Sequence, residues 1–273
     1  MSSARAASVA VAAGRGDRLC RGVDGAVFVV GSPRSGTTFL GGVVGGVDGF
    51  VDLGEVPALK SRIAAMRHRP ARLAAMEVRH VVTAELERRG APDARPVIHA
   101  PEVVFVLRAL PYVGDRVRAV HLVRDGRDVV CSLMEQGWLA SSAVGVDEAG
   151  WHLGGGARFW TERSRRAEFA RVPHARRAAW AWRRYVEAGL EARETGLLAT
   201  LRYERMCGDP RIAAARIARH LGVAPEQVDA GLAEVTAGSV GRYRRDLSGD
   251  DLPAVLSEAG ALLERLGYLG DTP

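Results

Sequence analysis

The sequence predicts an α/β protein of the P-loop type, in which helices flank a parallel sheet. Short apolar segments alternate with helical segments along most of the chain, a pattern that favours a parallel sheet covered on both faces. A glycine-rich turn joins the first apolar segment to a helix, as in phosphate-binding folds. The 273 residues, of which 47% are hydrophobic, are enough for one substantial core, so we expect a single domain.

The first predicted strand leads into a phosphate-binding loop. Residues 27–30 are apolar and mostly β-branched, which is typical of a buried parallel strand. Residues 31–38, Gly-Ser-Pro-Arg-Ser-Gly-Thr-Thr, have the glycine spacing of such a loop and open a helix. A nucleoside triphosphatase has a lysine after the last glycine, but Thr37 stands there and the fixed charge comes from Arg34. This favours a single 5′-phosphate, held by Arg34, Ser35, Gly36, Thr37 and Thr38.

A second strand-to-helix turn follows residues 119–123, which are strand-like. Arg124 ends that strand, and Ser132 lies eight residues later in a helical segment. The two side chains can meet on one phosphate, since the planar guanidinium donates two parallel hydrogen bonds to phosphate oxygens. The alternative is a surface ladder of arginine and aspartate, in which Asp125 and Asp128 favour the helix N-terminus.

Both motifs resemble those of sulfotransferases that use 3′-phosphoadenosine 5′-phosphosulfate (PAPS), especially the tyrosylprotein and bacterial small-molecule branches. The resemblance runs from about Val27 to Leu266 and is weakest over 137–180. It implies that the first loop binds the 5′-phosphosulfate, and that Arg124 and Ser132 bind the 3′-phosphate. The implied reaction moves a sulfuryl group to an acceptor hydroxyl, with 3′,5′-adenosine bisphosphate (PAP) as the other product. The alternatives are a P-loop kinase of a small metabolite and a non-catalytic nucleotide-binding relative.

The next predicted strand, Phe50 to Leu53, ends in a Gly-Glu pair. This pair is similar to the tyrosylprotein sulfotransferase pattern, which implies that Glu55 is the general base. A carboxylate at the carboxyl end of a parallel strand would face the crevice where ligands bind. Alternatively, Glu55 is a helix-capping acid ahead of Pro57.

His99 departs from the family pattern. Its segment, His-Ala-Pro, stands where much of the family has Lys-Asp-Pro or Lys-Asn-Pro, with a lysine that neutralises the leaving phosphate. A protonated His99 could supply that charge, or His99 could be the base with Glu55 as its orienting partner. A structural histidine at a strand end is the third possibility. Lys60 is a further candidate for the missing cation.

The remaining elements continue the alternation of strands and helices. A helical stretch from Pro57 to Arg89 is interrupted at Pro70, since proline ends or breaks a helix. A strand over Pro96 to His99 precedes a helix that starts at Pro101, the favoured first position. The last predicted elements are a strand over Leu197 to Tyr203 and helices within 210–234 and 251–267.

Two later segments resemble the nucleotide pocket of the family. The resemblance implies that Tyr203 contacts the adenine, and a structural tyrosine that caps the sheet is the alternative. Arg242 and Arg244 lie in a glycine-started basic loop, similar to the one that closes over the 3′-phosphate. A solvated basic loop is the alternative there.

The expected domain organisation has three parts. Residues 1–24 form a flexible N-terminal tail, residues 25–273 form the sulfotransferase domain, and 137–171 form a long loop that acts as a substrate lid. All the tryptophans fall at positions 138, 151, 160, 180 and 182. The last two lie on an expected helix and suit the core, whereas the first three suit an acceptor pocket.

The charge and the cysteine positions indicate which kinds of ligand, metal and cellular compartment to expect. The formal charge of +6 comes almost wholly from arginine, since Lys60 is the only lysine. A basic surface would steer a polyanionic nucleotide, and no nucleic-acid recognition motif accompanies it. Cys20, Cys131 and Cys207 share no metal-ligand spacing, so we expect no metal and a reducing cytoplasm. No membrane span or signal segment is expected. Carbohydrate, lipid, phenolic and peptide tyrosine acceptors all remain open, as does the oligomeric state.

Overall fold

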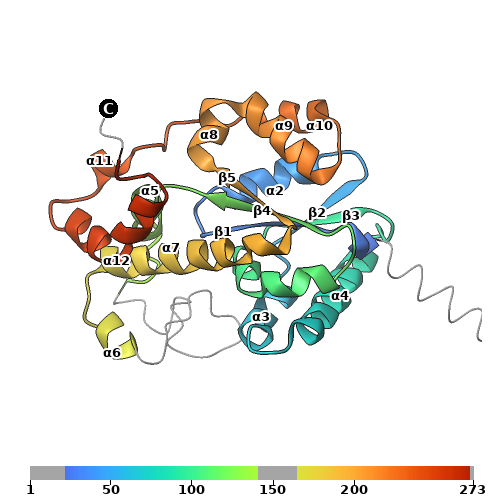
Figure 1. Ribbon diagram of the computed structural model, residues 1–273, viewed down its shortest axis with the longest axis horizontal. Helices are drawn as coiled ribbons and strands as arrows, with labels where there is room; N and C mark the ends of the chain where they lie inside the picture. The colour runs from blue at the N-terminus through green and yellow to red at the C-terminus, as the bar shows by residue number, and fades with distance from the viewer. Residues whose placement is uncertain (1–21, 141–164, 271–273) are drawn as a thin grey trace, which may run out of the picture.

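The computed structural model describes residues 22–140 and 165–270, and within them the strands form one parallel sheet. The strand order is β2-β3-β1-β4-β5, with β1 at the centre (Figure 1). This confirms the predicted α/β fold with a parallel sheet and flanking helices. The strands are β1 (Val27–Gly31), β2 (Phe50–Gly54), β3 (Arg95–Ile98), β4 (Arg118–Val123) and β5 (Leu198–Arg202).

Each face of the sheet is covered by its own set of helices (Figure 1). The central strand β1 serves both faces, because successive side chains of a strand point to opposite sides. Val27 and Val29 face one apolar core, whereas Phe28 and Val30 face the other. The first core includes α2 (Thr37–Gly45), α8 (Tyr203–Gly208), α9 (Pro210–Leu221) and α10 (Pro225–Leu232). The second includes α3 (Pro57–Met66), α4 (Ala71–Arg88), the 3₁₀ helix η1 (Pro101–Tyr112) and α7 (His174–Glu191).

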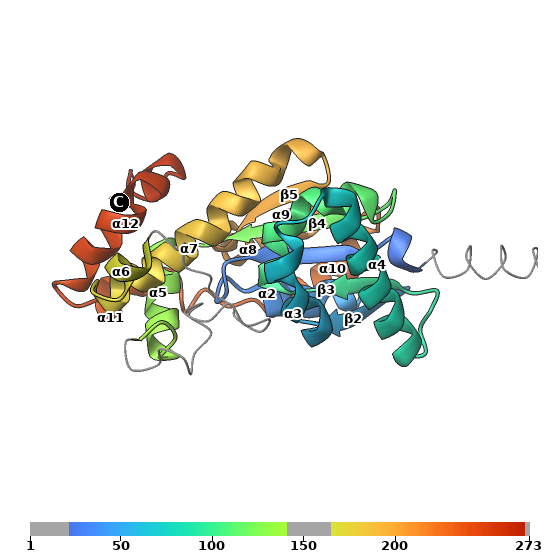
Figure 2. The same cartoon turned by 90° about the horizontal axis from the view of Figure 1, so that it is seen from below.

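The remaining helices gather mainly beyond one end of the sheet (Figure 2). They are α5 (Gly126–Glu135), α6 (Arg166–Phe169), α11 (Tyr243–Asp246) and α12 (Asp251–Arg265), while η4 (Ala192–Thr195) links α7 to β5. No helix in the described residues is both long and apolar enough to cross a membrane.

The predicted helix boundaries are confirmed, with one difference in helix type. The helical stretch from Pro57 breaks at Pro70, which is the N-cap of α4. The helix predicted at Pro101 is instead a 3₁₀ helix, and Val106 inside it has non-helical dihedral angles. A proline at position 111 adds to this irregularity, since proline cannot donate a backbone hydrogen bond.

The described tryptophans confirm the prediction for Trp180 and Trp182 but not for Trp138, which we expected in an acceptor pocket. Trp180 and Trp182 are buried in α7, and the indole of Trp182 donates to the carbonyl of Arg124 at 3.0 Å. Trp138 is partly buried against the same core. Trp151, Trp160 and most of the predicted lid lie outside the described residues, as do residues 1–21 of the predicted tail. Residues 22–24 form a helical turn.

The helix α7 is held to α12 by a cluster of charges around one carboxylate. Glu258 is only 5% exposed, and it accepts hydrogen bonds from Arg165, Arg176 and Arg183 at 2.8–3.3 Å. Burial opposes the ionisation of Glu258, but the guanidinium groups outweigh this effect and lower its pKa. The ionised carboxylate therefore stabilises the folded state.

We predict that Glu258→Gln lowers the free energy of unfolding by about 1.5–3 kcal/mol at pH 7, the contribution of hydrogen bonds to a charged group. The folded-state pKa is below the unfolded value, so this stabilisation is present above the ordinary glutamate pKa. It is lost as the pH falls through the folded pKa. Urea denaturation of both proteins at several pH values measures the difference.

The exposed Glu264, on the same helix, supplies the control. Glu264→Gln should leave the free energy of unfolding within about 0.5 kcal/mol of the parent protein. An equal loss in the two variants would contradict the role assigned to Glu258.

Candidate active site

The parallel sheet brings the predicted site residues to one edge, because the carboxyl ends of all strands meet there. The phosphate-binding loop follows β1 at the centre. His99 and then Glu55 follow β3 and β2 on one side, whereas Arg124 and then Tyr203 follow β4 and β5 on the other. The edge is thus divided between the two sets of residues.

The loop after β1 is closely packed and conformationally unusual. Gly36 has φ of +91°, and a Cβ there would lie 2.9 Å from the ring of Tyr203. Arg34 also adopts a left-handed backbone conformation (φ 70°). This conformation is uncommon for a residue with a side chain, and such residues occur often at functional sites. The hydroxyl of Ser35 is buried and has no hydrogen-bond partner in the described residues. The loop therefore presents an unsatisfied donor at the start of α2.

Three predicted phosphate ligands form a connected chain. The Nε of Arg34 donates to the hydroxyl of Ser132 at 3.0 Å, which joins the loop to α5. Arg124 donates to the carbonyl of Arg34 at 3.2 Å, and its own Nε is buried without a partner in the described residues. Arg124 and Ser132, which we predicted to meet on one phosphate, are therefore linked to each other through Arg34.

Tyr203 is buried between this loop and a later segment. The guanidinium of Arg124 lies over its ring, 4.6 Å from the ring centroid, and its hydroxyl lies 3.4 Å from the carbonyl of Thr236 and the hydroxyl of Ser239. Arg124 also donates to the carbonyl of Ser239 at 2.6 Å. Residues 236–244, which we call the strap, therefore lie against the two predicted nucleotide ligands.

The strap is fixed by Asp128, a buried residue in the first turn of α5. Its carboxylate accepts the backbone N–H groups of Gly241 and Tyr243 at 2.8 and 3.0 Å. Burial raises the pKa of Asp128. Asp128 therefore holds the strap, in addition to the interaction with the N-terminus of its helix that we considered from the sequence.

The two arginines of the strap point to different partners. Arg242 forms ion pairs with Glu135 and Asp246. The guanidinium of Arg244 lies 5.0 Å from the ring centroid of Tyr243. Neither side chain has a hydrogen bond to the Arg34, Ser132 and Arg124 chain within the described residues, although the strap backbone is held by Arg124.

His99 is buried beside α2 and pairs with an acid. Its Nε2 lies 3.4 Å from a carboxylate oxygen of Asp52, and its Nδ1 has no partner in the described residues. The close approach requires Gly41, because a Cβ at that position would lie 2.5 Å from the imidazole. Asp52 also accepts the N–H of Gly54 at 2.8 Å. His99 thus has Asp52 as its carboxylate partner.

Glu55 has a different partner. The ammonium of Lys60, on α3, lies 2.5 Å from its carboxylate and 3.6 Å from that of Glu102. Glu55 is 38% exposed, whereas Glu102 is 1% exposed. The only lysine of the chain therefore joins an accessible carboxylate to a buried one.

Comparison with known families decides the identity of this site. The family described as the sulfotransferase domain matches residues 24–237. The chain belongs to the sulfotransferase family. It is a PAPS-dependent enzyme that transfers a sulfuryl group, and not the kinase or the non-catalytic relative that the motifs left open. None of the curated proteins matches it by sequence.

Solved structures share the fold of this sulfotransferase. The sulfotransferase domain from the Curacin biosynthetic pathway is 15% identical, with a TM-score of 0.53 over 91% of this chain and 99% of that one. The sulfotransferase domain of the Synechococcus PCC 7002 olefin synthase is 17% identical, with a TM-score of 0.51 over 91% and 95%. The sulfotransferase STF9 from Mycobacterium avium is 14% identical, with a TM-score of 0.53 over 94% and 80%.

The residues of the sulfotransferase fit a bound PAPS. The buried Ser35 hydroxyl and the buried Nε of Arg124 are donors without partners in the described residues, as expected where anionic oxygens bind. Gly36 lets the ring of Tyr203 approach the phosphate-binding loop closely. Within residues 22–140 and 165–270, no group of three or more His, Cys, Asp and Glu side chains could hold a metal ion.

Several partners of the site residues were not identified from the sequence. The partners missed were Asp52 beside His99, Glu102 beside Lys60, and Ser239 beside Arg124. The sequence signal for a close approach to α2 was the spacing of Gly41 and Gly45. A Cβ at Gly45 would lie 2.5 Å from the Cβ of Asp52. A Cβ at Gly41 would lie 2.5 Å from the Cδ2 of His99. Glycines four residues apart lie on one helix face and allow close approach.

We predict that Gly36→Ala destabilises the sulfotransferase by about 1–3 kcal/mol, the cost of a strained left-handed residue. The new Cβ would also displace the ring of Tyr203 and weaken PAP binding. Urea denaturation and titration calorimetry measure the two effects. Gly42→Ala is the control, since a Cβ there meets nothing within 4 Å and alanine favours a helix. Unchanged stability and PAP affinity in Gly36→Ala would contradict the packing described above.

Proposed function

We propose that this sulfotransferase moves the sulfuryl group of PAPS to the hydroxyl of a small-molecule metabolite, with Glu55 as the general base. The observation that carries the proposal is the position of Glu55. It is an accessible carboxylate at the carboxyl end of β2, held by Lys60 and separated along the sheet edge from the phosphate-binding residues.

The site residues form two sets along the carboxyl edge of the sheet, which supports separate binding places for PAPS and for the acceptor. The proposed donor ligands follow β1, β4 and β5, and include the connected side chains of Arg34, Ser132 and Arg124. Glu55 and His99 follow β2 and β3 on the opposite side of β1. An acceptor that binds over β2 and β3 would therefore meet the sulfuryl group near the central loop.

The pairing with Lys60 supports Glu55 as the base rather than as a helix cap. The ammonium of Lys60 lies 2.5 Å from the Glu55 carboxylate and fixes its orientation. The helix α3 begins with Pro57 and has no side-chain cap hydrogen bond. Glu55 therefore does not cap this helix through its side chain.

His99 stands where much of the family has a cation, and it has a carboxylate partner of its own. Its Nε2 lies 3.4 Å from a carboxylate oxygen of Asp52. Glu55 forms its ion pair with Lys60, so the arrangement of His99 as base with Glu55 as its orienting partner receives no support. A protonated His99 could stabilise the charge that develops on the leaving phosphate.

In the proposed reaction, the acceptor oxygen forms a bond to sulfur as the bond from sulfur to the 5′-phosphate oxygen breaks. Glu55 takes the hydroxyl proton, and PAP leaves with the electron pair of the broken bond. Arg34, the loop N–H groups, Thr37 and Thr38 stabilise the leaving phosphate. Positioning of the reactants contributes roughly 7–11 kcal/mol in well-oriented systems.

We predict that the protein binds PAP without magnesium and much more tightly than ATP. The loop lacks the lysine that reaches the outer phosphates of ATP. Arg124→Ala should weaken PAP by about tenfold or more, since a charged hydrogen bond contributes about 1.5–3 kcal/mol. The same variant should leave 5′-AMP little changed, because that ligand has no 3′-phosphate. Calorimetry with both ligands tests this, and an equal loss for PAP and 5′-AMP would contradict a 3′-phosphate role.

We predict that Glu55→Gln keeps PAP affinity and lowers turnover by a factor of about 100–10,000, the usual contribution of a general base. His99→Lys should retain appreciable activity, since it restores the cation of the family beside Asp52. Turnover of PAPS with an accepted hydroxyl substrate measures both effects. Glu87→Gln, at an exposed glutamate of α4, is the control and should be fully active. An active Glu55→Gln together with an inactive His99→Lys would make His99 the base.

A further inference from the structure

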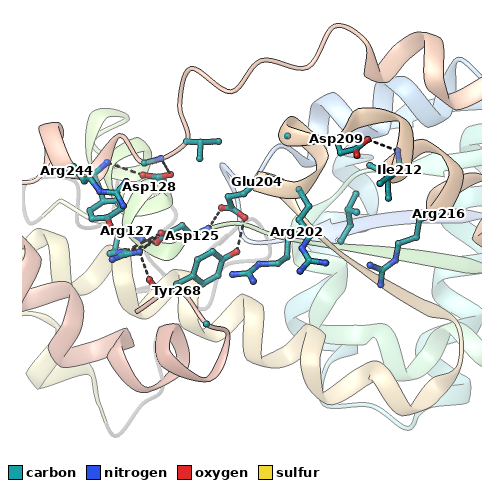
Figure 3. A pocket seen from close by; sticks show the side chains of 18 residues that line it. Asp125, Arg127, Asp128, Arg202, Glu204, Asp209, Ile212, Arg216, Arg244 and Tyr268 are labelled. Atoms are coloured by element: carbon teal, nitrogen blue, oxygen red, sulfur yellow. Dashed lines mark hydrogen bonds and ion pairs between the residues drawn. The ribbon is translucent and has the colours of Figure 1, made fainter. Parts of the chain in front are cut away.

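A second pocket lies between the end of β5, the helices α8 and α9, and the C-terminal part of the chain (Figure 3). Its volume is about 660 Å³, which is in the range of small-molecule sites. The lining comes from the start of α5, from residues 201–216, from the strap and from Gly267 and Tyr268. The proposed donor ligands Arg34, Ser35, Gly36, Arg124, Ser132 and Tyr203 do not line it, whereas Arg244 of the strap does.

Neighbouring residues separate the two sites. Arg124 and Tyr203 contact each other, and Tyr203 contacts the phosphate loop. The residues next to them in sequence, Asp125, Arg202 and Glu204, line the pocket. The donor site and the pocket therefore share the same backbone segments but, apart from Arg244, use different side chains.

The acids of the pocket are engaged by groups of the protein itself. Asp125 binds Arg127, with 2.7 Å between the closest atoms. Glu204 accepts the N–H of Asp125 at 2.7 Å and the hydroxyl of Tyr268 at 3.0 Å. Asp209 caps α9 through the N–H of Ile212. Each of these carboxylates therefore already accepts hydrogen bonds from the protein.

Three arginines of the pocket lining have no carboxylate partner among the described residues. Within the described residues, Arg202, Arg205 and Arg216 form no ion pair with a carboxylate, and Figure 3 shows Arg202 and Arg216 reaching the pocket from β5 and α9. Arg202 lies 4.2 Å from the ring centroid of Tyr268. Three unpaired guanidinium groups around one cavity favour an anionic ligand, since arginine donates bidentate hydrogen bonds to phosphate, sulfate and carboxylate.

Apolar surface lies beside this charge. Leu201, Ala213 and the ring of Tyr268 are buried side chains in the lining. Ile212 at the pocket is 68% exposed and Val240 is 39% exposed. A ligand that is only an inorganic anion would leave this surface uncovered, so the composition favours an anion with an apolar body.

We propose that this pocket is a second binding site, for a small-molecule anion that has an apolar or aromatic body and carries a phosphate, sulfate or carboxylate group. Arg205 and Arg216 hold the charged group together with Arg202, whereas Ile212, Ala213 and Tyr268 contact the body. The site uses none of Arg34, Arg124, Ser132 and Tyr203, although Arg244 of the strap lies in its lining.

The fluorescent probe 8-anilinonaphthalene-1-sulfonate tests this site, because it joins an aromatic body to one sulfonate. Titrations contain saturating PAP, so that the donor site is filled. The double variant Arg205→Ala with Arg216→Ala should weaken the probe by about tenfold or more, as expected for the loss of charged hydrogen bonds. The matched control, Arg211→Ala with Arg219→Ala, removes the same charge from exposed positions of α9 outside the pocket and should bind as the parent protein does.

A second pair of variants separates charge from apolar contact. Ile212→Glu should weaken the probe several-fold more than Ile212→Gln, because only the former places a negative charge beside the sulfonate. Equal affinity in the two arginine double variants would overturn the proposal. So would equal effects of the two Ile212 variants, or displacement of the probe by PAP in the parent protein.

Discussion

The parallel pairing of β1 with β4 fixes the phosphate-binding loop relative to Arg124. Val27 to Gly31 pair in register with Arg118 to Leu122, so the two strands end together. Gly31 allows this contact, since a Cβ there would lie 2.4 Å from the carbonyl of Leu122. The chain from Ser132 through Arg34 to Arg124 forms only because these ends coincide. The packing of Tyr203 on Gly36 extends the same alignment to β5.

Arginine carries out several structural tasks in this molecule because its guanidinium group has many donors in a fixed plane. Arg124 joins the loop carbonyl, the strap carbonyl and the ring of Tyr203. Three other arginines surround Glu258, and two of them, Arg176 and Arg183, hold α7 to α12. Arginine keeps its charge in these contacts, whereas the buried His121 does not. Burial lowers the pKa of His121 to about 3, so its imidazole stays neutral in the core. The high arginine content therefore has structural uses in addition to any effect on nucleotide steering.

The sequence was informative wherever the signal was local. The β-branched run before the loop, the glycines within it and the prolines at 57, 70 and 101 predicted the strand and the helix boundaries, because each acts on its own backbone. The family resemblance predicted which strand ends carry site residues. The partners of those residues could not be predicted, since Asp52 and Lys60 reach His99 and Glu55 only after β2 and α3 have packed. The helix type at 101–112 was also missed, because a 3₁₀ helix and an α-helix share the same apolar pattern over a few turns.

The position of β2 at the edge of the sheet has a consequence for the evolution of this enzyme. β2 pairs with β3, and β3 separates it from β1. Substitutions, insertions or changes of angle in β2 and α3 can therefore accumulate while the register of β1 with β4 and β5 stays intact. In the proposed function, one half of the sheet edge binds an unchanging nucleotide, and the other half meets the acceptor while keeping Glu55 and His99 in place. Descendants of one ancestral enzyme could in this way acquire different substrates without rebuilding the part that binds their common donor.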